Sequence, residues 1–325
     1  MSEEKRRFLD LIGNNDYGVL RAQWSASYTY LKKYPDVLWY RGDQIFHYTD
    51  LLGLIGILSN RGFWLSDARY LNDAEELHNG ANLTVELIQR LLVKKCYASF
   101  KEVLEGTLEK LNKTSFDHHY ICSFSMVADT LEHWRAYAMN GSGICIGFDL
   151  KNKTEYPHFR LGPNYFTQKV IYEDNIKIWI LLSVIHRYRH EFTQDLKDHS
   201  IDFRDDYINS MASSLSSVFV NFKNKAFHTE QEVRLVDSSS KIDFYNKKYH
   251  RVSNGMIVPY VCTYDTKLKK TSGEELNPDN LPISKIIVGP IASQESTINS
   301  IKDFISDLGF DSEIEVVKSN IPYRG

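Results

Sequence analysis

The sequence has few cysteines and places no two of them close together. Only four occur in 325 residues, so the chain offers neither a zinc-binding pair nor a short-spaced redox motif. The eleven histidines form no His-Glu-x-x-His pattern. We therefore expect free, buried thiols and no structural or catalytic metal. The cysteines are Cys96, Cys122, Cys145 and Cys262.

Long apolar runs and a strong net charge are also absent. No run reaches the roughly eighteen apolar residues that a membrane-spanning helix needs. The first residues, Met1 to Arg7, are charged rather than apolar, unlike a secretion signal. A formal charge of −3 gives no overall attraction for nucleic acid. We expect a cytoplasmic protein without a membrane partner.

Repeats, low-complexity tracts and Pro/Gly/Ser linkers are missing, which favours one elaborated α+β domain. We expect a helical N-terminal extension at 1–35 and a main domain at 36–325 with a helical insertion at about 174–226. Alternating or β-branched segments predict strands at 45–49, 63–66, 119–125, 143–149, 168–172, 232–236, 256–264, 283–288 and 313–317. Helical spacing predicts helices at 51–58, 72–111 (as two), 128–139, 174–226 (broken near 200–205) and 293–308.

The segment Glu230-Gln231-Glu232-Val233 places two acids one residue apart where a strand is expected to begin. On an extended backbone, Glu230 and Glu232 would share one face and repel each other. Such a pair is typical of a solvated edge or of a site that binds a cation or stabilises a cationic transition state. The structural alternative is an acidic strand edge whose charge is balanced by Arg234.

The order of three segments gives the pair a chemical context. A strand with His47-Tyr48-Thr49, a later strand with Ser123 and Ser125, and finally Glu-x-Glu resemble the ADP-ribosyltransferase superfamily. The resemblance implies a mostly antiparallel split β-sheet core and an enzyme that consumes NAD as substrate. It also implies a macromolecular acceptor, either protein or nucleic acid.

The resemblance assigns NAD-binding roles to several side chains. His47 would hydrogen-bond a ribose hydroxyl, beside Tyr48 and Thr49 on the same strand. Ser123 and Ser125 share a strand face and would line the nicotinamide pocket, with Trp134 and Tyr137 as an aromatic wall. Each position also has a structural interpretation: His47 and the serines as ordinary strand residues, and the three aromatic residues as core.

The resemblance gives catalysis to the glutamates. Glu232 would stabilise the positive charge that develops on the ribose as the nicotinamide bond breaks, and Glu230 would orient or deprotonate the acceptor. Water as acceptor would make the protein an NAD glycohydrolase. The alternative from another class is a noncatalytic sensor or scaffold that binds a partner protein.

A second resemblance covers nearly all of residues 38–325. It is to a bacterial family of unknown function akin to abortive-infection proteins, and it implies no particular activity. The ADP-ribosyltransferase expected from His47, Ser123, Ser125 and the two glutamates would be an intracellular toxin or an antiphage defence effector. The second resemblance adds Asn72 and Asp73 as possible site residues, although both also suit the start of a helix. The matching segments are His47-Tyr48-Thr49, 71–75, 122–125, 134–138, Gly147-Phe148, 230–235, 286–290 and 321–324.

Overall fold

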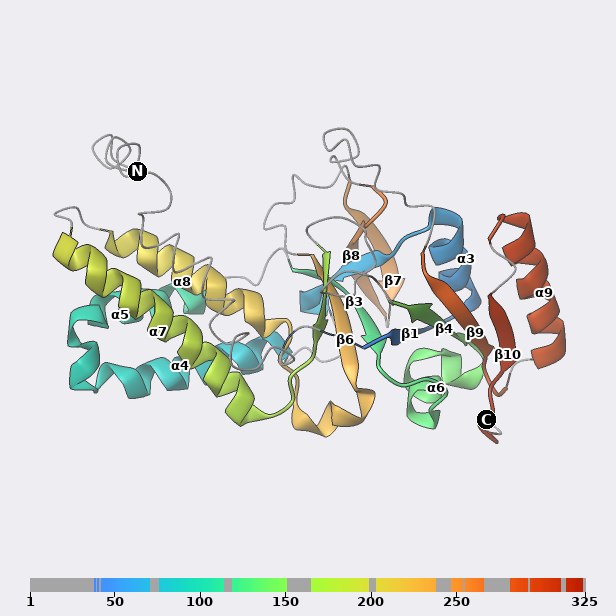
Figure 1. Ribbon diagram of the computed structural model, residues 1–325, viewed down its shortest axis with the longest axis horizontal. Helices are drawn as coiled ribbons and strands as arrows, with labels where there is room; N and C mark the ends of the chain where they lie inside the picture. The colour runs from blue at the N-terminus through green and yellow to red at the C-terminus, as the bar shows by residue number, and fades with distance from the viewer. Residues whose placement is uncertain are drawn as a thin grey trace. The chain divides into compact units, whose positions relative to one another are not determined.

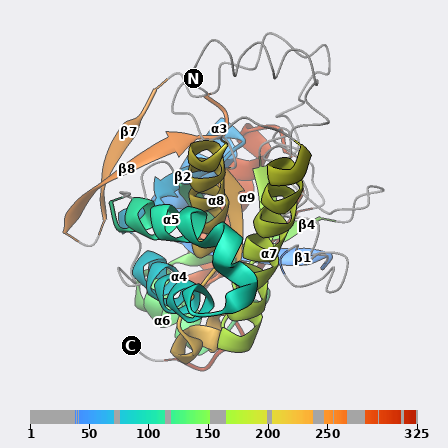
Figure 2. The same cartoon turned by 90° about the vertical axis from the view of Figure 1, so that its left-hand side faces the viewer.

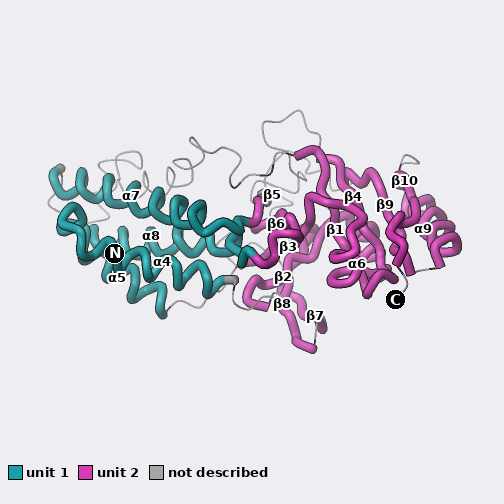
Figure 3. Tube along the Cα trace, turned by 90° about the horizontal axis from the view of Figure 1, so that it is seen from below, with its two compact units in different colours: residues 1–38, 72–117, 171–225 teal, residues 39–71, 118–170, 226–325 magenta. Residues whose placement is uncertain are grey.

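A computed structural model of the chain describes residues 38, 40, 42–70, 76–113, 119–150, 165–198, 203–237, 247–253, 255–265, 281–291, 293–310 and 314–323. The expected extension at 1–35 and the candidates Asn72 and Asp73 lie outside these ranges. The chain divides into two compact units, one formed by residues 1–38, 72–117 and 171–225 and the other by the remaining segments (Figure 3).

The first unit is helical in its described part (Figures 1 and 2). Gly80 allows two of its helices to approach closely, because a Cβ at this position would lie 2.8 Å from the Phe219 ring. The segment expected as an insertion at about 174–226 thus shares a unit with the earlier helices, a grouping that helical spacing alone did not predict. The elements are α4 (Glu76–Leu92), η2 (Lys95–Phe100), α5 (Lys101–Lys113), α7 (Asp174–Asp198) and α8 (Arg204–Phe219).

The second unit is built on an open, mostly antiparallel sheet in the order β10-β9-β4-β1-β3-β2-β8-β7, with β6 paired to β3 and β5 paired to β6. Only the β9–β10 pair is parallel among the described strands. The expectation of a mixed α+β fold is confirmed. The strands are β1 (Gln44–Thr49), β2 (Trp64–Asp67), β3 (Tyr120–Ser125), β4 (Ile144–Asp149), β5 (Tyr165–Lys169), β6 (Glu232–Asp237), β7 (Tyr249–Ser253), β8 (Met256–Cys262), β9 (Ile283–Val288) and β10 (Glu315–Lys318).

Helices cover both faces of this sheet. Residues of α3 (Leu51–Asn60) and α9 (Gln294–Asp307) join one core cluster with Ile45 and Ile146. Trp134 of α6 (Leu131–Tyr137) joins a second cluster with Tyr48 and Cys145. Neighbouring positions of one strand point to opposite faces, so the two clusters lie on opposite sides of the sheet. Short 3-10 helices complete the unit: η1 (Ala68–Tyr70), η3 (Met139–Gly141) and η4 (Lys225–Glu230).

β5 and β7 differ most from their sequence predictions. β5 begins at Tyr165, three residues before the predicted start, and β7 was not predicted. β7 forms a hairpin with β8 and is the last strand in the sheet order, so one of its edges has no described strand beside it. An edge strand needs no continuous apolar pattern, and only Val252 in β7 is aliphatic.

Candidate functional site

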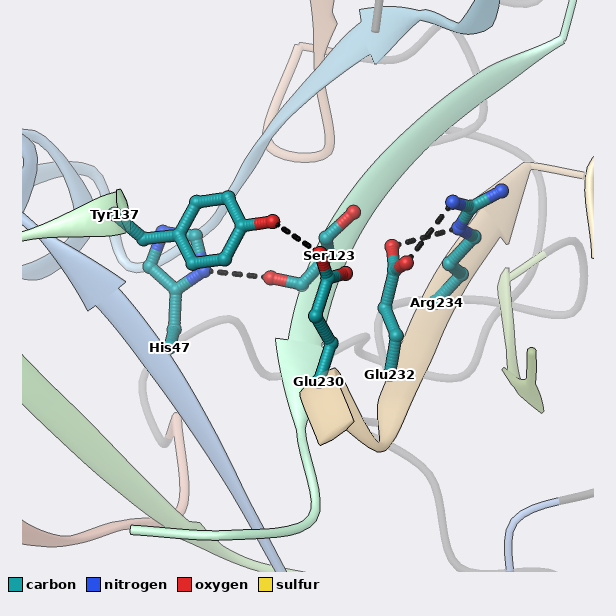
Figure 4. Close-up of polar contacts among 6 residues, drawn as sticks. All are labelled: His47, Ser123, Tyr137, Glu230, Glu232 and Arg234. Carbon is teal, nitrogen blue, oxygen red and sulfur yellow. Dashed lines mark hydrogen bonds and ion pairs between the residues drawn. The ribbon is translucent and has the colours of Figure 1, made fainter. Parts of the chain in front are cut away.

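The sheet branches at β3. One edge of β3 pairs with β6 from Ile121 to Ser125. The other edge pairs with β2 at Tyr120 and Ile121 and with β1 at Ser125. Between these pairs the edge has no described strand partner, and the imidazole of His47 occupies the gap: its Nδ1 lies 2.9 Å from the carbonyl oxygen of Ser123 (Figure 4).

The registers also show which side chains share a face. Ser125 lies opposite both Phe46 of β1 and Glu232 of β6, and Ser123 lies opposite Arg234. Directly opposed residues project to the same side, so Ser123, Ser125, Glu232 and Arg234 form one set. His47 follows Phe46 and therefore projects to the other side. The sheet registers consequently separate His47 from the glutamate and serine side chains expected to share its site.

Contacts of the His47 ring agree with this placement. The ring packs against Phe124 with 5.4 Å between centroids, and Nδ1 lies 4.0 Å from Cys122 Sγ. Burial lowers the pKa of His47, the bond to the Ser123 carbonyl opposes this effect, and the charge of Arg251 lowers the pKa further. Near neutral pH the imidazole is therefore uncharged. Because the carbonyl can only accept, Nδ1 carries the proton and Nε2 is an acceptor.

The Glu230-Gln231-Glu232 segment is a turn rather than the start of a continuous strand. Glu230 ends η4, Gln231 has a left-handed backbone with φ 43°, and β6 begins at Glu232. The inference that the glutamates share a face by strand alternation therefore does not hold. A left-handed backbone is uncommon for residues other than glycine, so surrounding contacts must hold this turn in place.

Those contacts come from β3 and α6. Ser125 Oγ donates to the carbonyl of Glu230 at 2.8 Å, and His133 Nε2 donates to the same oxygen at 3.1 Å. The amide of Met126 donates to the carbonyl of Gln231 at 2.9 Å. Burial lowers the pKa of His133, which favours a neutral ring whose Nδ1 accepts from Thr130 Oγ1 at 2.5 Å. The turn is thus rigidly positioned.

The carboxylate of Glu230 points toward α6. Tyr137 donates its hydroxyl hydrogen to Glu230 Oε1 at 2.7 Å (Figure 4). Both side chains are half-buried, so the carboxylate stays at the rim of the sheet while its position is fixed. Four positions separate His133 from Tyr137, which places them on one face of α6, where one holds the Glu230 carbonyl and the other its carboxylate.

Glu232 has a different environment. Its two carboxylate oxygens accept from Arg234 Nε at 2.7 Å and Arg234 Nη2 at 3.0 Å (Figure 4). Glu232 is 5% exposed and Arg234 is 1% exposed, so this two-point ion pair is buried. The geometry agrees with the structural alternative considered for Glu232, in which Arg234 balances its charge.

The remaining candidates divide between surface and core. Ser123 is exposed, whereas Ser125 is buried against the Glu230 turn. Trp134 is 0% exposed and its indole nitrogen donates to Asp129 Oδ1 at 2.8 Å, so it presents no face to a ligand here. Tyr48 packs against Trp134 and His133. Thr49 precedes Asp50, whose carboxylate caps α3.

Sequence reasoning did not single out two residues of this region. His133 fixes the Glu230 carbonyl, and its spacing from Tyr137 was a readable signal. Arg251 lies on the unpredicted strand β7, and its Nη2 donates to Ser66 Oγ on β2 at 2.8 Å. The Asn254-Gly255 dipeptide before β8 is a strong hairpin signal that would have located this strand.

The cysteines offer no nucleophile at this site. Burial raises the pKa of the Cys122 thiol to about 12, so it remains protonated near neutral pH. Cys122, Cys145 and Cys262 are buried and free, whereas Cys96 is exposed, contrary to the expectation that all four would be buried. Within the described ranges, no group of three or more His, Cys, Asp or Glu residues could hold a metal ion. No described helix combines the length and apolar character required to cross a membrane.

Comparison with known proteins identifies one region. Residues 133–235 match the family described as "Protein of unknown function (DUF2971)". The match begins at His133 on α6 and ends within β6, so it includes Tyr137, the Glu230 turn and the Glu232–Arg234 pair. No curated protein and no solved structure matches the chain significantly.

Proposed function

We propose that this protein is an NAD-consuming ADP-ribosyltransferase in which Glu230 is the reactive carboxylate. The observation that carries the proposal is the fixed turn at the start of β6. It presents a half-buried carboxylate bonded to Tyr137, while Ser125 and His133 hold its backbone. A preorganised carboxylate at the rim of a rigid sheet suits a reaction that develops positive charge.

The proposed reaction breaks the bond between ribose C1′ and the nicotinamide nitrogen. Nicotinamide leaves with the bonding electron pair, and positive charge develops on C1′ and the ring oxygen, as in glycoside cleavage. The Glu230 carboxylate stabilises that charge more strongly than it stabilises bound NAD. An acceptor hydroxyl or amine then bonds to C1′ and releases its proton to Glu230. With water as acceptor, the product is free ADP-ribose.

The proposal changes the expected roles of Glu232 and His47. Glu232 is engaged by Arg234, so we assign it to holding the first residues of β6 rather than to the reacting sugar. His47 projects to the other sheet face and bonds the Ser123 carbonyl, so we assign it to positioning β3. Ser123 and Tyr137 remain the proposed contacts for the nicotinamide half of NAD.

Nicotinamide release by the purified full-length protein tests the proposal. We expect release from NAD, alone or with cell extract, and a loss of about a hundredfold or more in Glu230→Gln. Glu232→Gln separates the two assignments, because a catalytic Glu232 would abolish release in a variant that still folds. Glu295→Gln is the control, since this exposed glutamate lies on α9. Equal, negligible release in every sample would refute both transferase and glycohydrolase.

Retention of the label from adenylate-labelled NAD identifies the acceptor. Label retained on protein or on nucleic acid would distinguish the two classes, whereas label in free ADP-ribose alone would indicate a glycohydrolase. If the protein acts as an intracellular toxin or antiphage effector, its expression should deplete cellular NAD and arrest growth. Glu230→Gln should do neither.

A noncatalytic scaffold is the second candidate. Val252 and Ile257 lie opposite each other on β7 and β8 and are 80% and 69% exposed. Contiguous exposed apolar surface is typical of protein interaction sites, and these two side chains adjoin each other at the sheet edge. Unaltered NAD in every sample, together with a partner lost on Val252→Asp, would favour this function.

A further inference from the structure

Arg251 reaches across the sheet from its edge. It lies on β7, and β8 separates β7 from β2 in the strand order. Its guanidinium nevertheless donates to the hydroxyl of Ser66 on β2 at 2.8 Å. Ser66 is buried, whereas Arg251 is exposed. The side chain is therefore laid over β8 and directed toward the branch at β3.

The charge of Arg251 has no acidic partner in the described part of the chain, where Ser66 is its only hydrogen-bond partner. The positive charge of Arg251 nevertheless acts on two groups at the branch, His47 and Cys122. The pKa of His47 is lowered mainly by burial and further by the positive charge of Arg251. The same charge opposes the rise that burial causes in the pKa of Cys122. A guanidinium with no acidic partner among the described residues, beside neutral groups, favours the approach of an anion.

The position of Ser66 relates this cation to the proposed reaction site. Ser66 lies opposite Ile121 on β3, and Ser123 is the next residue of β3 on that face. Two residues of strand span roughly 7 Å, so the Arg251–Ser66 contact, Ser123 and Ser125 follow one another along one face. Ser125 holds the Glu230 turn. These residues therefore lie along one sheet face, with the Arg251 guanidinium at one end and the Glu230 turn at the other.

We propose that Arg251, held by Ser66, binds the diphosphate of NAD while the nicotinamide ribose lies between Ser123 and Glu230. This inference rests on the proposed function and assigns the direction in which NAD lies in the site. A guanidinium can donate two parallel hydrogen bonds to phosphate oxygens, which lysine cannot reproduce. Ser66 keeps the long side chain in place before the substrate arrives, so less freedom is lost on binding.

Calorimetric titration of the full-length protein with ADP-ribose, ADP and adenosine tests the assignment. We expect Arg251→Gln to lower the affinity for ADP-ribose and for ADP about tenfold or more. The affinity for adenosine, which has no phosphate, should be unchanged. Arg251→Lys should restore only part of the affinity. Lys248→Gln removes a nearby cation just before β7 and should change the affinity for none of the three ligands. Unfolding curves should confirm that each variant is folded.

The outcomes separate this inference from the proposed function. If the wild type binds no phosphate ligand, or if Arg251→Gln weakens adenosine as much as ADP, the subsite is refuted. If ADP-ribose binding depends on Arg251 but no sample releases nicotinamide, the subsite stands and the transferase function fails. If nicotinamide is released with an unchanged KM in Arg251→Gln, the function stands and the subsite fails.

Discussion

The carboxylate of Glu232 accepts two hydrogen bonds from the guanidinium of Arg234, two residues later on the same strand. Both side chains project from β6 on the same side of the sheet as Ser125 and Ser123, their register partners on β3. Burying a single charge is costly, so each member of this pair makes the other tolerable. The pair also fixes the first residues of β6, immediately after the left-handed Gln231.

Breaking this pair should destabilise the protein strongly. We expect Glu232→Ala and Arg234→Ala each to lower the free energy of unfolding by about 3–5 kcal/mol, because the remaining charge is left buried. The double variant should lose less than the sum, with a coupling of about 0.5–3 kcal/mol. Urea unfolding of the wild type, the two single variants and the double variant measures this coupling energy.

A surface pair provides the control for this cycle. Lys285 and Glu315 join β9 to β10 with side chains 37% and 58% exposed, so Glu315→Ala should cost about 0–1 kcal/mol. Single-variant losses at positions 232 and 234 that are no larger than this control would contradict the importance of the buried pair.

Ser125 and Ser123 should respond differently to the same substitution. Ser125 Oγ donates to the Glu230 carbonyl and accepts from the amide of Val127, so Ser125→Ala removes a hydrogen bond from two part-buried backbone groups, of which the Glu230 carbonyl keeps His133. We expect a loss of about 1–3 kcal/mol and faster amide exchange around the turn. Ser123→Ala, at an exposed position on the same face, should stay within about 0.5 kcal/mol of wild type. Equal losses would contradict the anchoring role of Ser125.

The sequence was sufficient to predict most of the sheet because its buried strands carry a strong local signal. The apolar and β-branched residues of 143–149 and 283–288 predicted β4 and β9 to within a residue. β7 was missed because an edge strand has no such pattern, although Asn254-Gly255 marked its turn.

The geometry of the site was harder to predict, because it depends on contacts between distant segments. The alternation argument for Glu230 assumed an extended backbone, but contacts from Ser125, Met126 and His133 hold a turn there. Which way His47 projects depends on the register of β1 against β3, and no local pattern encodes that register. The sequence therefore pointed to candidate residues, but it did not predict which of their side chains lie on the same side of the sheet.

Two histidines whose pKa values are lowered in the folded protein should make stability depend on pH. The pKa values of both His47 and His133 are lowered in the folded protein, in each case chiefly by burial. The unfolded chain therefore binds protons first as the pH falls below about 6.5. The free energy of unfolding should be highest above that pH and decrease as the pH falls, until the folded histidines also become protonated.

The variant His133→Gln tests whether His133 contributes to this pH dependence of stability. The glutamine side-chain amide can still donate toward the Glu230 carbonyl but does not titrate. Thermal unfolding of His133→Gln between pH 7 and pH 5 should therefore show a shallower decrease in Tm than wild type. His250→Gln changes an exposed imidazole and should leave the slope unchanged. A wild-type Tm that is constant over this range would contradict the prediction.

Tyr137 should matter for the reaction more than for the fold. Its hydroxyl is bonded to the Glu230 carboxylate at the rim, where water can replace a lost donor. Tyr137→Phe should therefore cost little stability, yet leave the carboxylate free to rotate away from the sugar. A hydrogen bond to a charged group contributes about 1.5–3 kcal/mol, so nicotinamide release should fall about tenfold or more. Tyr323→Phe removes a comparable hydroxyl contact, with Asn140, and should retain full activity. If both variants release nicotinamide at the wild-type rate, Tyr137 does not position Glu230 for catalysis.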